Sequence, residues 1–334
     1  MTIRECTEKI ERETLSPYAC LSTESKGRER PMEPCTIRTE FQRDIDRIVH
    51  SKSFRRLKHK TQVFLQPEGD HYRTRMTHTL EVARIARTIT RGLRLNEDLV
   101  EAGALAHDLG HTPFGHAGER VLNEIIPGGF HHSVQSVRVV ERLENDGEGL
   151  NLTYEVRNAI ACHSAGKPAD TLEGQIVRFA DKIAYINHDI DDAMRGGIIY
   201  PTDIPAHLSK VLGYTHGERI NTLVEDIIVT SQGRNVVEQS PEVGAAMAEL
   251  KEFMFEEVYR NPKAKGEEGK AQDMVRALFD YYRANTDKLA PEYQDILVRE
   301  GADRAVCDYI AGMTDKYAVE CYSNAFIPMA WSVK

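Results

Sequence analysis

The sequence predicts an all-α fold, and three observations lead to this prediction. Apolar residues recur at helical spacing along most of the 334 residues, capping residues precede several of these stretches, and Gly-rich breaks separate them. Only the stretches HTPF and GGIIYP have the composition of a strand. With 41% hydrophobic and 28% charged residues, the chain has the composition of a globular protein with a sizeable core.

The helices are predicted in order along the chain. Residues 15–35 lack periodicity and are rich in Pro, Gly, Ser and charge, which indicates an arm before the main body. Helical patterns follow at 39–57 and 76–91, and another begins at the capping residue Asn96 and reaches Leu109. Further helices are expected at roughly 117–126, 133–145, 152–162, 172–194, 216–231, 244–260, 270–286 and 291–323.

Charge and hydropathy limit the classes of function. Forty-three basic and fifty-two acidic residues give a formal charge of -9, so the overall field favours neither nucleic acid nor an anionic membrane. The N-terminal segment MTIRECTEKIERE is charged, and no apolar run approaches the roughly 18 residues of a membrane span. We therefore expect a cytoplasmic protein that does not bind a membrane. The six cysteines form no CxxC pair, which disfavours a zinc ribbon or a thioredoxin-like motif.

Ionisable side chains gather in the segment ALAHDLGHTPFGHAGE, at the end of a helix that is apolar on nearly every side. They are His107, Asp108, His111, His116 and Glu119. Burial of so many ionisable groups is costly unless they are paired or bind a metal. His107 beside Asp108, taken alone, fits a hydrogen-bonded structural pair equally well.

The helix predicted at 172–194 has an apolar stripe and a separate polar stripe, both at helical spacing. The polar stripe consists of Asp181, Tyr185, His188, Asp189 and Asp192. It starts within the apolar run RFADKIAYI and includes a tyrosine. This composition favours the wall of a cleft over a solvated surface.

Two histidines and two aspartates from three predicted helices could bind one divalent metal ion in each subunit. They are His78, His107, Asp108 and Asp181, and His78 points inward because it precedes the core residue Val82 by four. Such mixed nitrogen and oxygen ligands suit Mn, Fe, Co or Ni, can hold Zn, and are less typical of Mg. The ligands do not identify the metal.

The order of these four residues is that of the HD-domain phosphohydrolases, and five longer segments carry a closer resemblance. They are EFQRDIDRIVHSKSFRRLKHKTQVF, EGDHYRTRMTHTLEVARIAR, AGALAHDLGHTPFGHAGE, GQIVRFADKIAYINHDIDDA and DYIAGMTDKYA. Over roughly residues 28–325 the chain resembles the deoxyguanosinetriphosphate triphosphohydrolase-like proteins. The resemblance implies an HD-domain helical bundle with additional N- and C-terminal helices. We expect an N-terminal arm at 1–35, the HD-domain catalytic core at 36–231, and a C-terminal helical region at 232–334 packed on the core.

The resemblance also implies roles for individual residues. The resemblance implies that His78, His107, Asp108 and Asp181 are the metal ligands. It also implies that His116 and Glu119 lie beside the scissile phosphate. His132 matches a further catalytic histidine, although the neighbouring His131 leaves this register open. For His111, both a phosphate contact and a helix-capping role stay open.

Substrate-binding positions are implied in the same way. They are Gln62 and Val63 at the deoxyribose, Arg75 near the base or phosphate, Lys182 and Arg219 at the phosphates, and Tyr185 and Asp189 at the sugar. Tyr185 would exclude a 2′-hydroxyl by sterics, and Asp189 would bind the 3′-hydroxyl. A triphosphate carries about four negative charges, so an acidic protein needs local basic residues to bind it. Each arginine taken alone is more often part of a surface ion pair.

Together these assignments predict metal-dependent hydrolysis of deoxynucleoside triphosphates, with dGTP favoured, to deoxynucleoside and tripolyphosphate. The alternatives are an HD phosphohydrolase of a nucleoside monophosphate or signalling nucleotide, and a non-catalytic nucleotide sensor or single-stranded nucleic-acid binder. The resemblance further implies a homo-oligomer, with an allosteric nucleotide and weakly bound single-stranded nucleic acid as further partners. The base preference, the native metal, the number of subunits and the identity of the general acid stay open.

Overall fold

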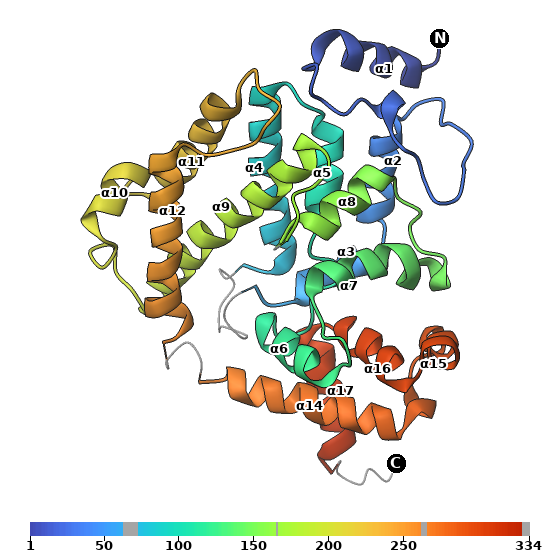
Figure 1. Cartoon of the computed structure of the whole chain (residues 1–334). Coiled ribbons are helices and arrows are strands. Elements are labelled where there is room, and N and C mark those ends of the chain that lie inside the picture. The colour runs from blue at the N-terminus through green and yellow to red at the C-terminus, as the bar shows by residue number, and fades with distance from the viewer. Residues whose placement is uncertain (63–72, 165, 262–265, 329–334) are drawn as a thin grey trace, which may run out of the picture.

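The computed structural model describes residues 1–62, 73–164, 166–261 and 266–328, which form helices joined by loops (Figure 1). These residues contain no β-strand, only isolated bridges between Arg28 and Thr153 and between Thr61 and Thr74. The predicted all-α fold is confirmed. Within the same residues, no helix has the length and apolar character that a membrane span requires.

Helices of very different length follow one another along the chain. The α-helices are α1 (Ile3–Thr14), α2 (Glu40–Val49), α3 (Lys52–Arg56), α4 (Arg75–Leu93), α5 (Glu97–Ala106), α6 (His116–Ile125), α7 (His132–Arg138), α8 (Tyr154–Cys162), α9 (Leu172–Arg195), α10 (Ala206–Leu212), α11 (His216–Ser231), α12 (Pro241–Met254), α14 (Glu268–Ala284), α15 (Gln294–Glu300), α16 (Ala302–Ala311) and α17 (Asp315–Phe326). Short 3-10 and π turns lie between them, namely η1 (Ser22–Glu24), η2 (Leu57–His59), η3 (Val139–Leu143), η4 (Asn145–Gly147), η5 (Phe255–Tyr259), η6 (Thr286–Lys288) and η7 (Pro291–Tyr293).

Two predicted helices are divided in the structure by local breaks. The pattern at 39–57 forms α2 and α3, because the Ser51 side chain accepts a hydrogen bond from the N–H of Phe54 and starts a new helix. The range 291–323 is divided into α15, α16 and α17. Between α15 and α16, Gly301 has a φ of 90°, a backbone conformation that side-chain-bearing residues rarely adopt.

Two further boundaries differ from the sequence prediction. The N-terminal arm contains α1, which starts with a reciprocal capping box between Thr2 and Glu5. Helix α5 ends at Ala106 rather than at Leu109, so His107 lies just beyond its last turn. Because of this earlier end, His107 and Asp108 lie in a turn and not in the helix.

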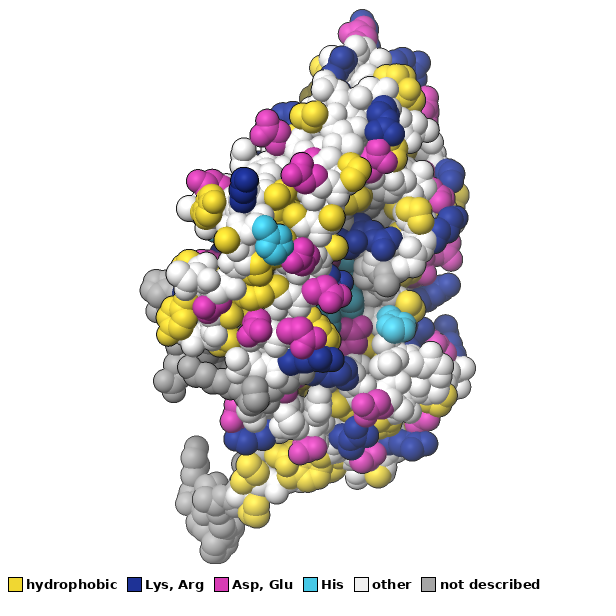
Figure 2. All heavy atoms as spheres, turned by 60° about the vertical axis from the view of Figure 1, so that its left-hand side comes forward, with side chains coloured by type: hydrophobic (Ala, Val, Ile, Leu, Met, Phe, Trp, Pro, Cys, Tyr) yellow, Lys and Arg dark blue, Asp and Glu magenta, His cyan; other side chains and the backbone are white. Residues whose placement is uncertain are grey.

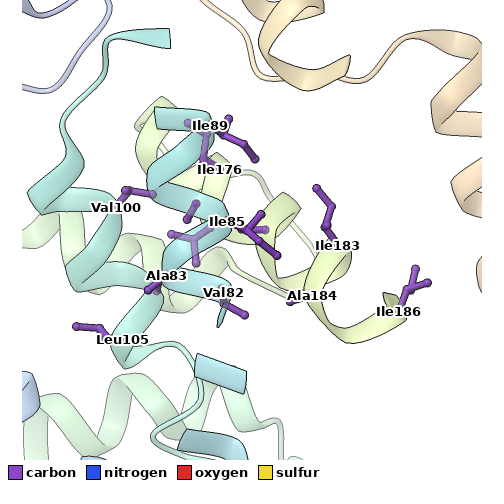
Figure 3. Close-up of a cluster of buried hydrophobic side chains, with 14 of the residues drawn as sticks. Val82, Ala83, Ile85, Ile89, Val100, Leu105, Ile176, Ile183, Ala184 and Ile186 are labelled. Atoms are coloured by element: carbon purple, nitrogen blue, oxygen red, sulfur yellow. The ribbon is translucent and has the colours of Figure 1, made fainter. Parts of the chain in front are cut away.

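Helix α5 lies in the larger hydrophobic core and packs against α2, α4, α8 and α9. Gly103 permits the close approach, because a Cβ there would lie 3.0 Å from the Ala159 Cβ and 3.2 Å from the Val177 Cγ2. Figure 3 shows side chains of α4, α5 and α9 in this core, including Ile85 and Ile176. The apolar stripe predicted for α9 is therefore part of the core.

A second hydrophobic cluster joins α6 to the C-terminal helices α14, α16 and α17 (Figure 1). Leu122 of α6 and Phe279 of α14 are both buried in it. Helix α12 instead contributes Leu250 to the larger core. Helix α6, which carries His116 and Glu119, is thus attached to the C-terminal region, whereas α4, α5 and α9 build the larger core. The predicted division into an arm, a catalytic core and a C-terminal region stays a prediction.

Glu173, at the start of α9, connects three segments of the chain through hydrogen bonds. Its Oε1 accepts the backbone N–H groups of Cys20 and Asn96, both at 3.0 Å. Its Oε2 is buried and has no hydrogen-bond partner among the described residues. Burial raises the pKa of Glu173 to about 7, from an ordinary value of 4.5. The pKa of Glu173 is higher in the folded than in the unfolded chain, so protonation of Glu173 stabilises the fold. This contribution to the free energy of unfolding is complete below pH 4.5 and is lost as the pH rises to about 7.

We predict that Glu173→Gln removes this pH dependence. Relative to the variant, the wild-type free energy of unfolding should fall by roughly 2 to 3 kcal/mol between pH 5 and pH 8, since one pKa unit corresponds to about 1.4 kcal/mol. Urea unfolding at several pH values measures the difference. Glu24→Gln, at an exposed position, is the control and should leave the dependence unchanged. A difference that does not vary with pH would contradict the role given to Glu173.

Candidate metal centre and active site

The structure brings the four predicted metal ligands together from three segments. His78 comes from α4, Asp181 from α9, and His107 with Asp108 from the turn after α5. The His78 Nε2 lies 3.1 Å from the Asp181 Oδ1, and the His107 Nε2 lies 3.6 Å from both the Asp181 Oδ1 and the Asp108 Oδ2. Figure 2 shows a hollow on this side of the molecule where histidine, acidic and basic side chains gather.

His107 is held in an orientation that suits a metal ligand. Its Nδ1 lies 2.7 Å from the carbonyl oxygen of Ala104, three residues earlier in the last turn of α5, and donates its proton there. In a neutral ring the Nε2 then carries a lone pair. This Nε2 is buried and has no hydrogen-bond partner in the part of the chain that the structure describes. A buried lone pair without a donor is costly, and a cation beside it removes that cost.

The two aspartates are ionised despite their burial. Burial acts to raise the pKa of Asp108, but the nearby His107 and Arg75 outweigh it and hold the pKa well below its ordinary value. For Asp181, the hydrogen bond with His78 and the nearby His107 likewise outweigh burial and lower the pKa to about 2. Both carboxylates are therefore available as anionic oxygen ligands, and the set of donors fits a divalent metal.

A second cluster, built around Glu119 of α6, adjoins the metal ligands. The Glu119 carboxylate lies 2.9 Å from the Nδ1 of His116 and 2.9 Å from the Nδ1 of His132, and it accepts the backbone N–H of His132. Burial acts to raise the pKa of Glu119, but the two histidines lower it well below its ordinary value. Burial lowers the pKa of His132, yet Glu119 outweighs burial and raises it. The structure thus places His132 in this cluster, while His131 is exposed.

His163 is a site residue that the sequence analysis missed. It lies just after α8, is 1% exposed, and donates its Nδ1 proton to the carbonyl oxygen of Ile160 at 2.7 Å. Its Nε2 lies 3.2 Å from the Nε2 of His132. Burial and the nearby His107 and His132 lower the pKa of His163 to about 4. The sequence offered one signal: AIAC before His163 resembles GALA before His107, each an apolar helix end followed by histidine.

His111 lies flat against His132, with the ring centroids 4.6 Å apart and the planes at 15°. It is buried, and its Nδ1 has no hydrogen-bond partner within the described residues. Burial, together with Arg75 and His132, lowers the pKa of His111 well below its ordinary value. His111 does not cap α6, because Gly115 precedes this helix and no side chain caps it.

Of the residues predicted at the deoxyribose and base, two are described and Val63 lies outside the described residues. Arg75 is buried, and its Nη1 donates to the Asp108 Oδ2 at 2.7 Å, so it first serves as the charge partner of a metal ligand. The Gln62 Oε1 is buried and has no hydrogen-bond partner among the residues that the structure places. Gln62 therefore has an acceptor available for a ligand.

Asp189 and Tyr185 follow Asp181 along one face of α9. Burial raises the pKa of Asp189 to about 7, although a hydrogen bond from Tyr259 acts against this shift. Tyr259 donates its hydroxyl proton to the Asp189 Oδ2, while the Oδ1 is buried without a hydrogen-bond partner in the described ranges. Tyr259 lies in η5, and no sequence pattern connected it to α9. Half-buried Tyr185 packs against the larger core, and burial raises its pKa.

The two remaining predicted phosphate contacts differ in position. Lys182, on α9, is half-buried, and burial together with Arg178 lowers its pKa. Arg219, on α11, is buried, and its Nε donates to the Asn187 Oδ1 at 2.9 Å. No hydrogen bond or ion pair found among the described residues joins Arg219 to the metal ligands. The role of Arg219 as a phosphate contact therefore stays a prediction.

Comparisons with known proteins agree with this geometry. The family model of the HD domain matches residues 75–186, a range that contains all four predicted metal ligands. The model of the phosphohydrolase-associated domain matches residues 237–324. The first match covers the helices of the metal centre, and the second covers most of the C-terminal region.

Curated relatives match almost the full length of the chain. A deoxyguanosinetriphosphate triphosphohydrolase-like protein of Caldanaerobacter subterraneus subsp. tengcongensis is 60% identical over 331 residues, covering 99% of this chain and 98% of the relative. Proteins of the same name from Desulfatibacillum aliphaticivorans and Clostridium perfringens are 52% and 50% identical, each covering 98% of this chain and at least 98% of the relative. The chain therefore belongs to the deoxyguanosinetriphosphate triphosphohydrolase-like family of HD-domain proteins.

Proposed function

We propose that the protein hydrolyses deoxynucleoside triphosphates to deoxynucleoside and tripolyphosphate, with dGTP as the favoured substrate. One observation carries the proposal: the buried, unpartnered Nε2 of His107 faces two ionised aspartates, directly beside the hydrogen-bonded cluster of Glu119 and His132. A metal-binding set next to proton-transferring groups is what phosphoester hydrolysis requires. The family name of the relatives supports the substrate class.

His78, His107, Asp108 and Asp181 would hold one divalent metal, with Mn, Fe, Co, Ni, Zn and Mg as the candidates. When bound, such a metal stabilises negative charge on phosphoryl oxygens and lowers the pKa of a bound water. Arg75 keeps Asp108 in place through its 2.7 Å hydrogen bond. Water would attack the α-phosphorus, and the 5′-oxygen of the nucleoside would leave.

His116 is the better candidate for the acid that protonates the leaving oxygen. Both ring nitrogens of His132 are engaged, one by Glu119 and the other by His163. His116 uses its Nδ1 for Glu119, and its side chain is 67% exposed, so a substrate can reach it. Glu119 would orient His116, while His132 and His163 hold Glu119 and stabilise its charge.

Gln62, Tyr185 and Asp189 would bind the deoxyribose, and Val63 is proposed at the sugar edge. The unpartnered Oδ1 of Asp189 is an acceptor for the 3′-hydroxyl. Lys182 and Arg219 are proposed as phosphate contacts. We also propose that the protein acts as a homo-oligomer in the cytoplasm, with an allosteric nucleotide or single-stranded nucleic acid as further partners.

The reaction is tested with purified, metal-stripped protein, each of the four dNTPs and GTP, and Mn, Mg, Co or Ni added singly. We expect deoxynucleoside and tripolyphosphate as products, with dGTP turned over fastest and GTP hardly at all. Asp108→Ala should retain less than about 1% of the activity, because it removes a metal ligand. His131→Ala, at an exposed neighbour of the site, should stay active. Release of phosphate or pyrophosphate would contradict the mechanism, and no turnover even of mixed dNTPs would favour a sensor.

His163→Ala should lower kcat by roughly tenfold with little change in KM. The reason is that His132 loses the acceptor for its Nε2 proton and no longer holds Glu119 in one orientation. Cys162→Ala, at the preceding residue, is the matched control and should keep wild-type kcat. Steady-state kinetics measures both, and metal analysis should show unchanged metal content. An increase in KM with unchanged kcat would show that His163 acts elsewhere.

Tyr259→Phe should raise KM for deoxynucleoside triphosphates by about fivefold at pH 7, because loss of one hydrogen bond costs about 1 kcal/mol. The hydrogen bond from Tyr259 acts to lower the pKa of Asp189, so its loss leaves more of this carboxyl protonated, and a protonated carboxyl is a weaker acceptor for a hydroxyl than a carboxylate. Tyr200→Phe, at an exposed tyrosine, is the control. Equal KM values for wild type and Tyr259→Phe would show that Tyr259 does not contribute to binding of the sugar.

A further inference from the structure

Asp315 is the first residue of α17 and belongs to the segment DYIAGMTDKYA, which the proposed mechanism does not use. An acidic residue in the first turn of a helix ordinarily faces solvent and interacts with the helix dipole. Asp315 is only 4% exposed. Its carboxylate is directed away from its own helix, toward two segments of the active site.

Both oxygens of Asp315 accept hydrogen bonds from these segments. The Oδ1 accepts the backbone N–H of Phe114 at 2.9 Å. The Oδ2 accepts the backbone N–H of Thr61 at 2.9 Å and also the Thr61 hydroxyl. One buried carboxylate thus connects two segments that are 53 residues apart in the sequence, since Thr61 and Phe114 differ by that number.

Each of the two segments leads directly to a residue with a proposed role in the reaction. Thr61 precedes Gln62, and Phe114 is followed by Gly115 and His116. Phe114 and Gly115 have φ values of 61° and 58°, so the chain makes a sharp turn that starts α6 at His116. A non-glycine residue with positive φ needs its surroundings to hold it in place, and the Asp315 Oδ1 accepts its N–H.

The two segments also contact each other. A Cβ on Gly115 would lie 3.5 Å from the carbonyl oxygen of Gln62 and 3.2 Å from the Arg75 Nη2. The turn before His116 therefore packs directly on the backbone of Gln62. A small displacement of one segment changes the distance between the proton-transferring group and the sugar-binding group.

Lys60 forms a second, parallel connection. It is buried, and its ammonium group donates to the carbonyl oxygens of His111 and Ala311. Lys60 and His111 belong to the same two active-site segments, and Ala311 lies just before Asp315 in the C-terminal region. Hydrogen bonds of both Lys60 and Asp315 thus join the C-terminal region to the site.

We propose that Asp315 is a positioning residue for the hydrolytic reaction, which holds the turn before His116 and the segment before Gln62 in one relative geometry. The inference rests on the proposed function, because His116 and Gln62 act on the substrate only in that reaction. Asp315 itself lies behind both segments and accepts hydrogen bonds from their backbone.

The test compares Asp315→Asn with wild type and with Asp303→Asn. Asp303 is likewise in the first turn of a helix, α16, but it pairs with Arg283 and has a side chain 35% exposed. We expect Asp315→Asn to lower kcat by roughly tenfold to a hundredfold and to raise KM, because a misplacement of about 1 Å can cost a hundredfold in rate. Metal content should not change. Asp303→Asn should match wild type.

A double-mutant comparison separates positioning from general destabilisation. In a His116→Ala background, Asp315→Asn should lower kcat by less than about twofold, because the group that Asp315 positions is already absent. The increase in KM should persist, since it depends on Gln62. A loss of kcat by the same factor in both backgrounds would overturn the proposal.

Backbone amide hydrogen exchange gives a readout that needs no turnover. Exchange at Thr61 and Phe114 should be faster in Asp315→Asn and unchanged in Asp303→Asn. If wild type hydrolyses no dNTP, the proposed function fails, and the exchange data still decide whether Asp315 holds the two segments. Unchanged exchange at both amides would overturn the positioning role.

Thr61→Val covers the case in which Asp315→Asn does not fold. It removes only the hydroxyl that donates to the Asp315 Oδ2 and keeps the shape of the side chain. We expect an increase in KM of about threefold or more, because one hydrogen bond that holds the segment before Gln62 is lost. Wild-type kinetics of Thr61→Val, with Asp315→Asn unfolded, would overturn the proposal.

Discussion

The burial of His107 and Asp108 at the end of α5 is the constraint on which the other site elements depend. Helix α5 is apolar on nearly all sides and ends inside the larger core. The carbonyl end of the helix is electronegative, and the carboxylates of Asp108 and Asp181 add to this charge. Arg75 and His78 on α4 offset only part of it. A divalent cation would complete the charge balance, which is why we propose the four converging residues as its ligands.

The proton arrangement in the second cluster follows from one backbone contact. His163 donates its Nδ1 proton to the carbonyl of Ile160, so a neutral His163 can only accept at Nε2. The proton between the two rings then belongs to His132, whose other nitrogen faces Glu119. His132 is therefore positively charged and stabilises the Glu119 carboxylate. In this way a main-chain carbonyl fixes the charge of a carboxylate two side chains away.

The sequence predicted that His78, His107, Asp108 and Asp181 lie together as candidate metal ligands, because they stand within or beside helical apolar patterns. Periodicity placed His78 and Asp181 on inward faces, and the apolar character of α5 made His107 and Asp108 conspicuous. The structure brings all four together. The roles of Glu119 and His132 came from the family resemblance, since no spacing rule connects α6 with α7.

His163, Tyr259 and Asp315 could not be found in the same way. Each acts through a partner that is distant in the sequence: His163 is 31 residues from His132, and Tyr259 is 70 residues from Asp189. Local patterns describe helix faces, whereas these contacts depend on how helices are stacked. The sequence also does not show which glycines are required by close packing between helices. A Cβ on Gly110 would lie 2.1 Å from the backbone nitrogen of Ser136, a close approach that only the tertiary structure reveals.

The proposed active site lies where the two hydrophobic clusters meet. The metal ligands belong to helices of the larger core, whereas His116 and Glu119 are carried by α6, which packs against the C-terminal helices. The distance between the proposed metal site and His116 therefore depends on contacts between the clusters. Asp308, fully buried in α16, accepts from Gln135 of α7, so the helix that begins with His132 is also held from the C-terminal side. The C-terminal region thus holds segments of the proposed active site in place, although none of its described residues reaches the predicted metal ligands in the contacts found.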